Sequence, residues 1–291
     1  MTILELLNIS TEHLKSQGIT NPKTSCEILL AHALGLRRLD LYLKYDQPVT
    51  EEERQRFKEL YKRRLNREPL QYIIGETEFM SLPFTVNPHV LIPRPETELV
   101  VETTIKHVRR NWGSEPVQIV DIGVGCGNIA VSLAHYLPGA QVTGFDISQA
   151  AVDVAIHNAE RNNLADLVTL AARDLFECAH DDFHDLHLVI SNPPYVSTVD
   201  EEFLEKDVVD YEPHVALFAG KDGLRFFHQI SELARSWLRP GGLLIYEIGY
   251  EIGDKVVSII KNNQFTHIEL LQDYARNDRI VIAEKPENQK E

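Results

Sequence analysis

Apolar side chains recur every three or four positions through the first ~75 residues, a spacing typical of amphipathic helices. A first helix is predicted over Ile3–Gln17. Asn21 can cap a second helix with Pro22 at its first position, and Thr50 opens a capping box that Glu53 closes three residues on. The sequence therefore predicts a small module of three or four helices at the N-terminus.

Beyond this module the pattern changes to extended, β-like residues over Gln71–Val86, in two runs separated by Gly75. Such runs around a glycine indicate a short hairpin that links two domains. Pro93 and Pro95 then hold the chain extended and allow a helix to begin at Pro95 or Glu96.

Strand and helix patterns alternate through the rest of the chain, which predicts an α/β fold with a parallel sheet covered by helices on both faces. The expected strands are Val117–Asp121, Gln141–Asp146, Val168–Ala172, Leu186–Ser191 and Leu243–Ile248. The expected helices are Asn128–Leu137, Gln149–Asn162, Leu224–Leu238 and Glu251–Asn262. Two final strands, Ile268–Leu271 and Ile280–Ala283, have no helix between them, so we expect an antiparallel strand at the end.

The net charge of −15 bears on the partners of this protein, because nucleic-acid-binding proteins neutralise phosphates with a basic surface. The dense basic segment Arg54–Arg67 is interleaved with acidic residues, and we interpret it as a solvated helix face. We therefore expect no direct contact with nucleic acid.

Composition narrows the class of protein further. Hydrophobic residues make up 43% of the chain, enough to bury a sizeable core, so disorder is expected only at Lys285–Glu291. The three cysteines, Cys26, Cys126 and Cys178, form no Cys-x-x-Cys pair, which argues against disulfides and structural zinc. With no signal peptide or long apolar run, we expect a soluble cytoplasmic protein that has no membrane segment and no metal site.

A glycine-rich turn, Asp121–Asn128, joins the first strand of the α/β part to its helix. Glycines at 123, 125 and 127 let the backbone turn tightly and lie against a ligand at the helix N-terminus. A dinucleotide-binding loop would place its third glycine at 128, where this chain has Asn128. The spacing instead resembles the first motif of class I methyltransferases. Cys126 is interpreted as a small loop residue, because no histidine partner is indicated for a nucleophile.

Two acidic residues end the next two strands. Asp146 can accept hydrogen bonds from both hydroxyls of a ribose, and its charge would exclude a 2′-phosphate. Asp174 can accept from an adenine amino group while Leu175 packs on the ring. Each aspartate alone could instead be a helix cap. Together and in this order they predict a site for a nucleoside-containing cofactor.

The fourth strand runs into Asn192-Pro193-Pro194-Tyr195. A planar –NH2 group is a weak nucleophile, and the Asn192 side-chain oxygen with the Pro193 carbonyl can hold its two hydrogens. The prolines stiffen the loop, and Tyr195 offers a flat face for stacking. Asn-Pro-Pro alone would be interpreted as a turn. At this position it predicts methyl transfer to a planar nitrogen by alignment, without a metal or strong base.

Asn-Pro-Pro-Tyr after such a glycine turn resembles adenine-N6 DNA methyltransferases and protein glutamine-N5 methyltransferases. Further segments resemble the PrmC/HemK family of glutamine methyltransferases. These segments are Leu91–Glu98, Tyr211–Pro213, Ala216-Leu217, Gly220, Asp222–Leu224 and Tyr246–Gly249. The helical module and hairpin are similar too, so the resemblance covers nearly the whole chain. Leu175 departs from those relatives that carry an aromatic residue there.

The resemblance implies a Rossmann-like class I methyltransferase with a seven-stranded sheet, its last strand pair antiparallel. It implies S-adenosyl-L-methionine as cofactor, S-adenosyl-L-homocysteine as product, and the glutamine of the Gly-Gly-Gln loop of class I peptide chain release factors as substrate, a function in translation termination. The implied cofactor contacts are Gly123, Val124, Gly125, Cys126, Gly127, Asp146, Asp174, Leu175 and Asn192. Asn192, Pro193, Pro194 and Tyr195 would hold the glutamine, with Asn192, Pro193 and Tyr195 catalytic.

Three parts are expected: a substrate-docking helical domain over 1–75, a hairpin and linker over 76–94, and a methyltransferase domain over 95–291. We expect a monomer. The role of Pro93–Glu96 is left open between a connector and a wall of the active site. Four other functions are weighed against this one: a glutamine methyltransferase of a ribosomal protein, a DNA adenine methyltransferase, a non-catalytic binding module and an NAD-dependent oxidoreductase. The charge disfavours the DNA enzyme, the intact Asn192–Tyr195 disfavours the binding module, and Asn128 disfavours the oxidoreductase.

Overall fold

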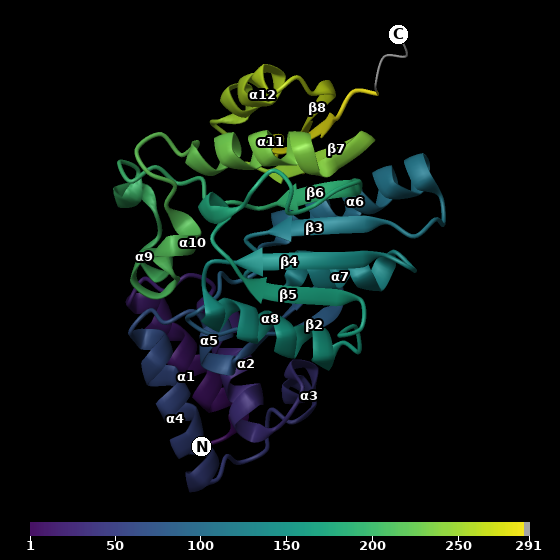
Figure 1. Cartoon of the computed structure of the whole chain (residues 1–291). Helices are drawn as coiled ribbons and strands as arrows, with labels where there is room; N and C mark the ends of the chain where they lie inside the picture. Colours follow the sequence, from purple (N-terminus) through teal and green to yellow (C-terminus); the bar gives the residue numbers. More distant parts are fainter. Residues whose placement is uncertain (288–291) are drawn as a thin grey trace. The chain divides into compact units, whose positions relative to one another are not determined.

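The computed structural model describes residues 1–287, and the chain divides into two compact units (Figure 1). The helical unit comprises Met1–Glu76 with Glu205–Tyr211, and the sheet unit comprises Thr77–Leu204 with Glu212–Glu291. The tail was predicted to be disordered from Lys285. Residues 288–291 lie outside the described residues, whereas the Lys285 amide still donates to the Gly242 carbonyl and the Lys285 carbonyl accepts from the Gly241 amide.

Five helices of the first 76 residues form the core of the helical unit. They are α1 (Ile3–Ser16), α2 (Pro22–Leu34), α3 (Arg38–Leu43), α4 (Glu51–Leu65) and α5 (Leu70–Ile74). The capping box of Thr50 and Glu53 is confirmed, with both reciprocal bonds present. Pro22 begins α2 as predicted, but Asn21 is left-handed and its side chain makes no cap bond, so that part of the prediction is wrong.

The extended run predicted from Gln71 is wrong over its first residues, which form the short helix α5. Tyr72 and Ile73 are buried, and Ile73 belongs to the core of the helical unit, so tertiary packing overrides their β propensity. Gly75 ends α5 in a left-handed conformation. The hairpin follows as β1 (Glu76–Phe79) and β2 (Leu82–Thr85).

The helical unit also contains α9 (Lys206–Tyr211), which no sequence pattern predicted. Arg64 of α4 donates to Asp207 at 2.8 Å, and the Tyr211 hydroxyl donates to the Asn66 carbonyl at 2.6 Å. The guanidinium of Arg64 is nearly buried, so this ion pair is largely shielded from water. A segment distant in sequence is therefore fastened to the N-terminal helices.

The sheet unit is built on seven strands in the order β5-β4-β3-β6-β7-β9-β8. Their bounds are β3 (Gln118–Ile122), β4 (Gln141–Asp146), β5 (Val168–Ala172), β6 (Leu186–Ser191), β7 (Leu238–Glu247), β8 (Thr266–Gln272) and β9 (Asp278–Glu284). The first five are parallel, whereas β9 lies antiparallel between β7 and β8. The predicted α/β fold with an antiparallel last strand pair is confirmed.

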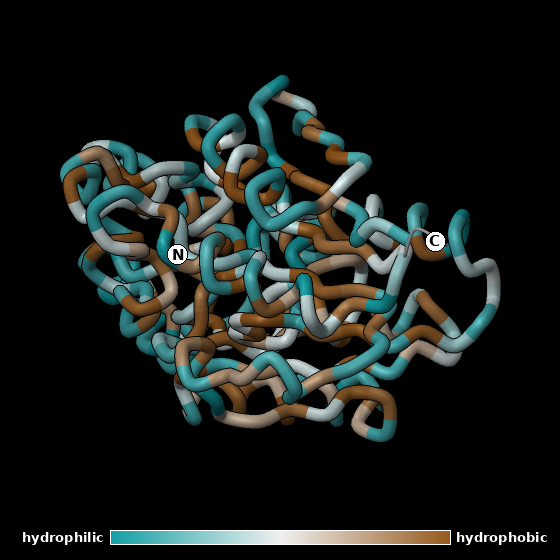
Figure 2. The backbone as a smooth tube through the Cα atoms, turned by 45° about the horizontal axis from the view of Figure 1, so that its top comes forward, coloured by the Kyte–Doolittle hydropathy of each residue, from teal (hydrophilic) through white to brown (hydrophobic). Residues whose placement is uncertain are grey.

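Two layers of helices cover the sheet. One layer holds α6 (Pro95–Trp112), α7 (Asn128–Tyr136) and α8 (Gln149–Arg161), and the other holds α11 (Arg225–Trp237) and α12 (Gly253–Asn262). Short helices lie in the connections: η1 (Leu175–Glu177), η2 (Glu201–Phe203) and α10 (His214–Leu217). Hydrophobic stretches run through the interior and hydrophilic ones predominate at the outer turns (Figure 2). No described helix is long and apolar enough to cross a membrane.

Pro240-Gly241-Gly242 was predicted to precede a strand, but it lies inside β7. The register between β6 and β7 shifts at this place. A side chain at Gly242 would meet the carbonyls of Arg239 and Leu186 at 2.9 Å, so the glycine permits a close approach of two backbones.

Candidate active site

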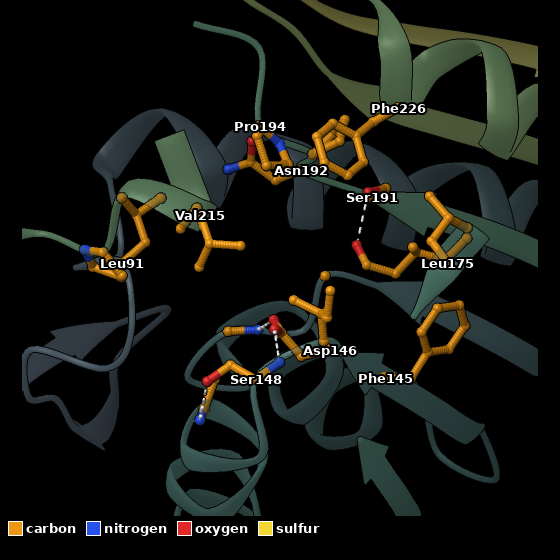
Figure 3. Close-up of a pocket in the computed structure, with 18 of the residues that line it drawn as sticks. Leu91, Phe145, Asp146, Ser148, Leu175, Ser191, Asn192, Pro194, Val215 and Phe226 are labelled. Carbon is orange, nitrogen blue, oxygen red and sulfur yellow. Dashed lines mark hydrogen bonds between the residues drawn. The ribbon is translucent and has the colours of Figure 1, made fainter. Parts of the chain in front are cut away.

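A cavity of about 310 Å³ opens at the carboxyl ends of the parallel strands (Figure 3). The chain winds from β3 to β4 and β5 on one side and to β6 and β7 on the other, so the strand order reverses between β3 and β6. Ligands of open α/β sheets bind at such a reversal, in pockets of this size. The cavity is the candidate active site of the sheet unit.

The glycine turn after β3 lies on the floor of this cavity. The amides of Gly123 and Val124 donate to the Phe145 carbonyl at 2.9 and 3.1 Å, which folds the turn against β4. Gly123 and Gly125 line the cavity and have positive φ angles. A Cβ added at either would meet no atom within 4 Å, so both positions leave space for a ligand against the backbone.

Asp146 ends β4 and lines the same cavity. One carboxylate oxygen accepts from the Gly125 amide and the other from the Ser148 amide, both at 3.0 Å. Each oxygen has a second acceptor position, so the side chain can fix the glycine turn and still accept from a ligand's hydroxyls.

The third strand contributes an apolar wall. Asp174 caps η1 by accepting from the Phe176 amide at 2.9 Å, and Leu175 and Phe176 line the cavity. The Arg225 guanidinium lies 4.0 Å from the centre of the Phe176 ring, a cation–π contact that the sequence did not indicate. This wall has flat apolar surface with a carboxylate at its edge, as an adenine requires.

Asn192, Pro193 and Pro194 line the cavity from the end of β6. The preceding Ser191 hydroxyl donates to the Ile122 carbonyl at 2.7 Å, which ties the ends of β6 and β3 together. In Figure 3, Asn192 and Pro194 lie across the cavity from Asp146 and Ser148. A ligand held at Asp146 therefore has Asn192 on the facing wall.

Four predicted site residues do not line this cavity: Val124, Cys126, Gly127 and Tyr195. Val124 packs beneath Gly144, and a Cβ at Gly127 would come within 3.2 Å of Ala155, so both shape the packing around the turn. Cys126 is buried, which raises the pKa of its thiol to about 12 and leaves it protonated at neutral pH. The Tyr195 ring packs against Gly249.

Arg94 and Glu212 give the proline segment its structural role. Arg94 donates to the buried Glu212 carboxylate at 2.5 Å, and the Ile92 amide donates to its other oxygen at 3.4 Å. Leu91 lines the cavity, whereas Pro93–Glu96 does not. Glu212 therefore fastens this segment through Arg94 and the Ile92 amide, and Leu91, just before it, forms part of the cavity wall.

Asp121 lies beneath the glycine turn and is only 1% exposed. Neither carboxylate oxygen has a well-formed hydrogen bond among residues 1–287, and the backbone of Ala130 is the hydrogen-bonding group that acts on the carboxyl. Burial raises the pKa of Asp121 to about 7, so the carboxyl is partly neutral at physiological pH. Among residues 1–287, no group of histidine, cysteine and acidic side chains is arranged to hold a metal ion.

The residues present fit S-adenosylmethionine. The backbone at Gly123 and Gly125 leaves room, Asp146 retains acceptor positions, and the Leu175 wall is apolar. The strand order, with β9 inserted antiparallel between β7 and β8, is that of class I methyltransferases. Fold and cavity together therefore define the class as S-adenosylmethionine-dependent methyltransferases.

Comparison with known proteins specifies the family. Residues 5–75 match the PrmC N-terminal domain and residues 97–210 the methyltransferase small domain. The release factor glutamine methyltransferase of Geobacter sulfurreducens is 41% identical, over 96% of this chain and 95% of that protein. The protein of the same name from Fusobacterium nucleatum is 38% identical, over 97% and 78%. The chain belongs to the release factor glutamine methyltransferase family.

Solved structures agree on the fold. The hMettl16 catalytic domain matches with a TM-score of 0.55 and 18% identity, over 72% of this chain and 77% of that one. At this identity the likeness is evidence for the class I methyltransferase fold alone.

Proposed function

We propose that this protein transfers a methyl group from S-adenosyl-L-methionine to the side-chain amide nitrogen of the glutamine in the Gly-Gly-Gln motif of class I peptide chain release factors. Full-length similarity to relatives of that name supports the substrate. The observation that carries the chemistry is that Asn192 and Pro193 line the same cavity as Asp146.

The cofactor is held by residues on three strand ends. Asp146 would accept from the ribose hydroxyls, while Asp174 and Leu175 would hold the adenine, and Gly123 and Gly125 would pass beneath the methionyl part. When bound, S-adenosylmethionine supplies a methyl group on a positively charged sulfur, and S-adenosyl-L-homocysteine is the neutral leaving group. Val124, Cys126 and Gly127 support this site through packing.

The substrate amide is held by the loop after β6. Its nitrogen lone pair is delocalised, so the nitrogen reacts only when its hydrogens are held and the lone pair faces the methyl group. The Asn192 Oδ1 and the Pro193 carbonyl accept one N–H each, and Pro194 and Tyr195 complete the proposed contacts. Catalysis then comes mainly from proximity and orientation.

We propose that the helical unit docks the release factor. On α3, Leu39 and Leu43 are 74% and 85% exposed, while Leu41 between them is buried in the core of the unit. Leu39 and Leu43 are four residues apart and so share one face of the helix, and exposed apolar side chains that gather on one face are what a protein-binding surface offers. That the protein acts as a monomer in the cytoplasm, without direct contact to nucleic acid, stays a prediction.

The test of this function uses a purified class I release factor and isotopically labelled S-adenosylmethionine. Mass spectrometry of the digested release factor should find one methyl group, on the glutamine of Gly-Gly-Gln. A release factor with alanine in place of that glutamine is the control and should stay unlabelled. Label on another residue, or none on either protein, would overturn the proposal.

A further inference from the structure

Two buried polar side chains form a hydrogen-bonded chain behind Asn192. The Asn192 Nδ2 donates to the Thr97 Oγ1 at 3.5 Å, and the Thr97 hydroxyl donates to a Glu247 carboxylate oxygen at 2.7 Å. Thr97 and Glu247 are each 2% exposed. Thr97 stands in the first turn of α6 and Glu247 ends β7, the strand beside β6.

The direction of each hydrogen bond follows from the number of protons available. A threonine hydroxyl has one proton, and Thr97 uses it toward Glu247 because an ionised carboxylate can only accept. The Thr97 oxygen is then left with lone pairs and can only accept from Asn192. Asn192 must therefore turn its –NH2 group to Thr97, and its Oδ1 is left free to face the substrate.

We propose that Thr97 and Glu247 are positioning residues that fix the orientation of the Asn192 amide, so that its oxygen and not its nitrogen faces the glutamine to be methylated. This inference rests on the proposed function of Asn192 as an acceptor. A flipped Asn192 would present two donors to a substrate –NH2 group, which also donates. Such a site would repel the group it has to hold.

The charge of Glu247 decides the direction of the hydrogen bonds from Asn192 through Thr97 to Glu247. The charged groups that act on it are Arg279 on β9, Glu96 on α6 and Arg94 just before α6, and the Tyr195 hydroxyl lies in the same environment. Burial raises the pKa of Glu247 to about 7, and the hydrogen bond from Thr97 opposes that shift. Below this pH a protonated carboxyl can donate to Thr97, which can then donate to the Asn192 oxygen. Protonation of Glu247 therefore reverses the orientation that methyl transfer needs.

The experiment measures single-turnover methylation of purified release factor at saturating cofactor. Thr97→Val removes the hydroxyl at nearly constant volume, and Thr97→Ser keeps it. Thr104→Val is the matched control: Thr104 is buried on the same helix, but its hydroxyl only donates to the Val100 carbonyl. We expect Thr97→Val to slow the reaction ~10-fold or more, as misorienting a reacting group does. Thr97→Ser and Thr104→Val should stay within ~3-fold of the wild-type rate, well below the ~10-fold change expected for Thr97→Val.

Two further readouts separate positioning from a structural role. Calorimetric affinity for S-adenosylmethionine should be nearly the same in all four proteins. In the wild type the rate should rise with pH through about 7, and in Glu247→Gln, which has no proton to lose there, this rise should become smaller, with only the part due to Asp121 left. A Thr97→Val enzyme as fast as Thr104→Val, a Thr97→Ser enzyme as slow as Thr97→Val, or an unchanged pH profile in Glu247→Gln would overturn the inference. If the wild type itself fails to methylate the release factor, the proposed function fails instead.

Discussion

At the scale of single residues, two neighbouring aspartates near the cavity, Asp146 and Asp121, have different environments. Asp146 accepts from two backbone amides and faces the cavity. Asp121 is buried beneath the turn, and its raised pKa reflects the loss of hydration. A carboxyl that is partly neutral repels Asp146 less than a full charge would. Asp146, which lines the cavity, is the aspartate whose oxygens can reach a ligand.

Replacing Asp146 by alanine should weaken S-adenosylmethionine binding. The change removes acceptors for the ribose hydroxyls, each worth about 1.5–3 kcal/mol when charged, and it also releases the Gly125 amide. We expect the dissociation constant from calorimetric titration to rise by at least ~10-fold. Asp153→Ala is the control, since Asp153 is exposed on α8 and does not line the cavity. Equal affinities for the two variants would show that Asp146 does not bind the cofactor.

The site residues that could be predicted from the sequence are those in short motifs at the ends of strands. Asp146 ends an expected strand, Asn192 directly follows one and Leu175 comes three residues after another, so their approach to one cavity follows from the parallel sheet. Thr97 and Glu247 lie 150 residues apart, and no local pattern indicates that they touch. Such a contact depends on packing between α6 and β7, which only the folded structure contains.

At the scale of elements, tertiary burial determined whether a segment became a helix or a strand wherever the local sequence pattern was ambiguous. The alternating strands and helices beyond Val117 were predictable because their hydrophobic periods differ clearly. Tyr72–Ile74 has β-branched and aromatic residues but folds as α5, since these side chains are needed in the core of the helical unit. Lys206–Tyr211 spans only six residues, too few for a helical period to stand out, and Asp207 and Tyr211 fasten α9 to Arg64 and Asn66.

The attachment of α9 predicts a stability change. Asp207→Ala should lower the free energy of unfolding by ~1–3 kcal/mol, because the nearly buried Arg64 charge loses its carboxylate but keeps the carbonyls of Arg67 and Glu68. Urea denaturation of the full chain measures this. Asp210→Ala removes the same charge from an exposed position of α9 and should have little effect. If both variants were equally stable, the ion pair would not fasten α9.

At the scale of the whole molecule, the chain passes between its two units at residues 76–77, 204–205 and 211–212. The second passage follows Asn192–Tyr195 by nine residues, so the proposed substrate-holding loop is connected through a short segment to the proposed docking unit. A release factor bound by the helical unit would thus be held near the methyl-transfer site by covalent connection, which raises its effective concentration there.

A chain truncated to begin at Thr77 tests the docking role. The truncation keeps the hairpin, because Phe79 and Phe84 are buried in the sheet unit and Thr85 exchanges two hydrogen bonds with Asn158. Provided that it folds, this chain should bind S-adenosylmethionine as the full chain does. Its kcat/KM should fall strongly on intact release factor but little on a short Gly-Gly-Gln peptide. An equal fall on both substrates, or none on either, would contradict docking by the helical unit.

Residue, element and domain meet in one step, in which Asn192 orients a glutamine amide for direct methyl transfer. Single-turnover methylation of purified release factor at saturating cofactor tests it most directly, with Asn192→Ala, Asn192→Asp and the exposed control Asn111→Ala. We predict that Asn192→Ala lowers the rate constant ~100-fold or more, the scale of a misplaced reacting group, while Asn111→Ala equals the wild type. Asn192→Asp still accepts hydrogen bonds and should fall between them. An Asn192→Ala enzyme as fast as the wild type would contradict the account.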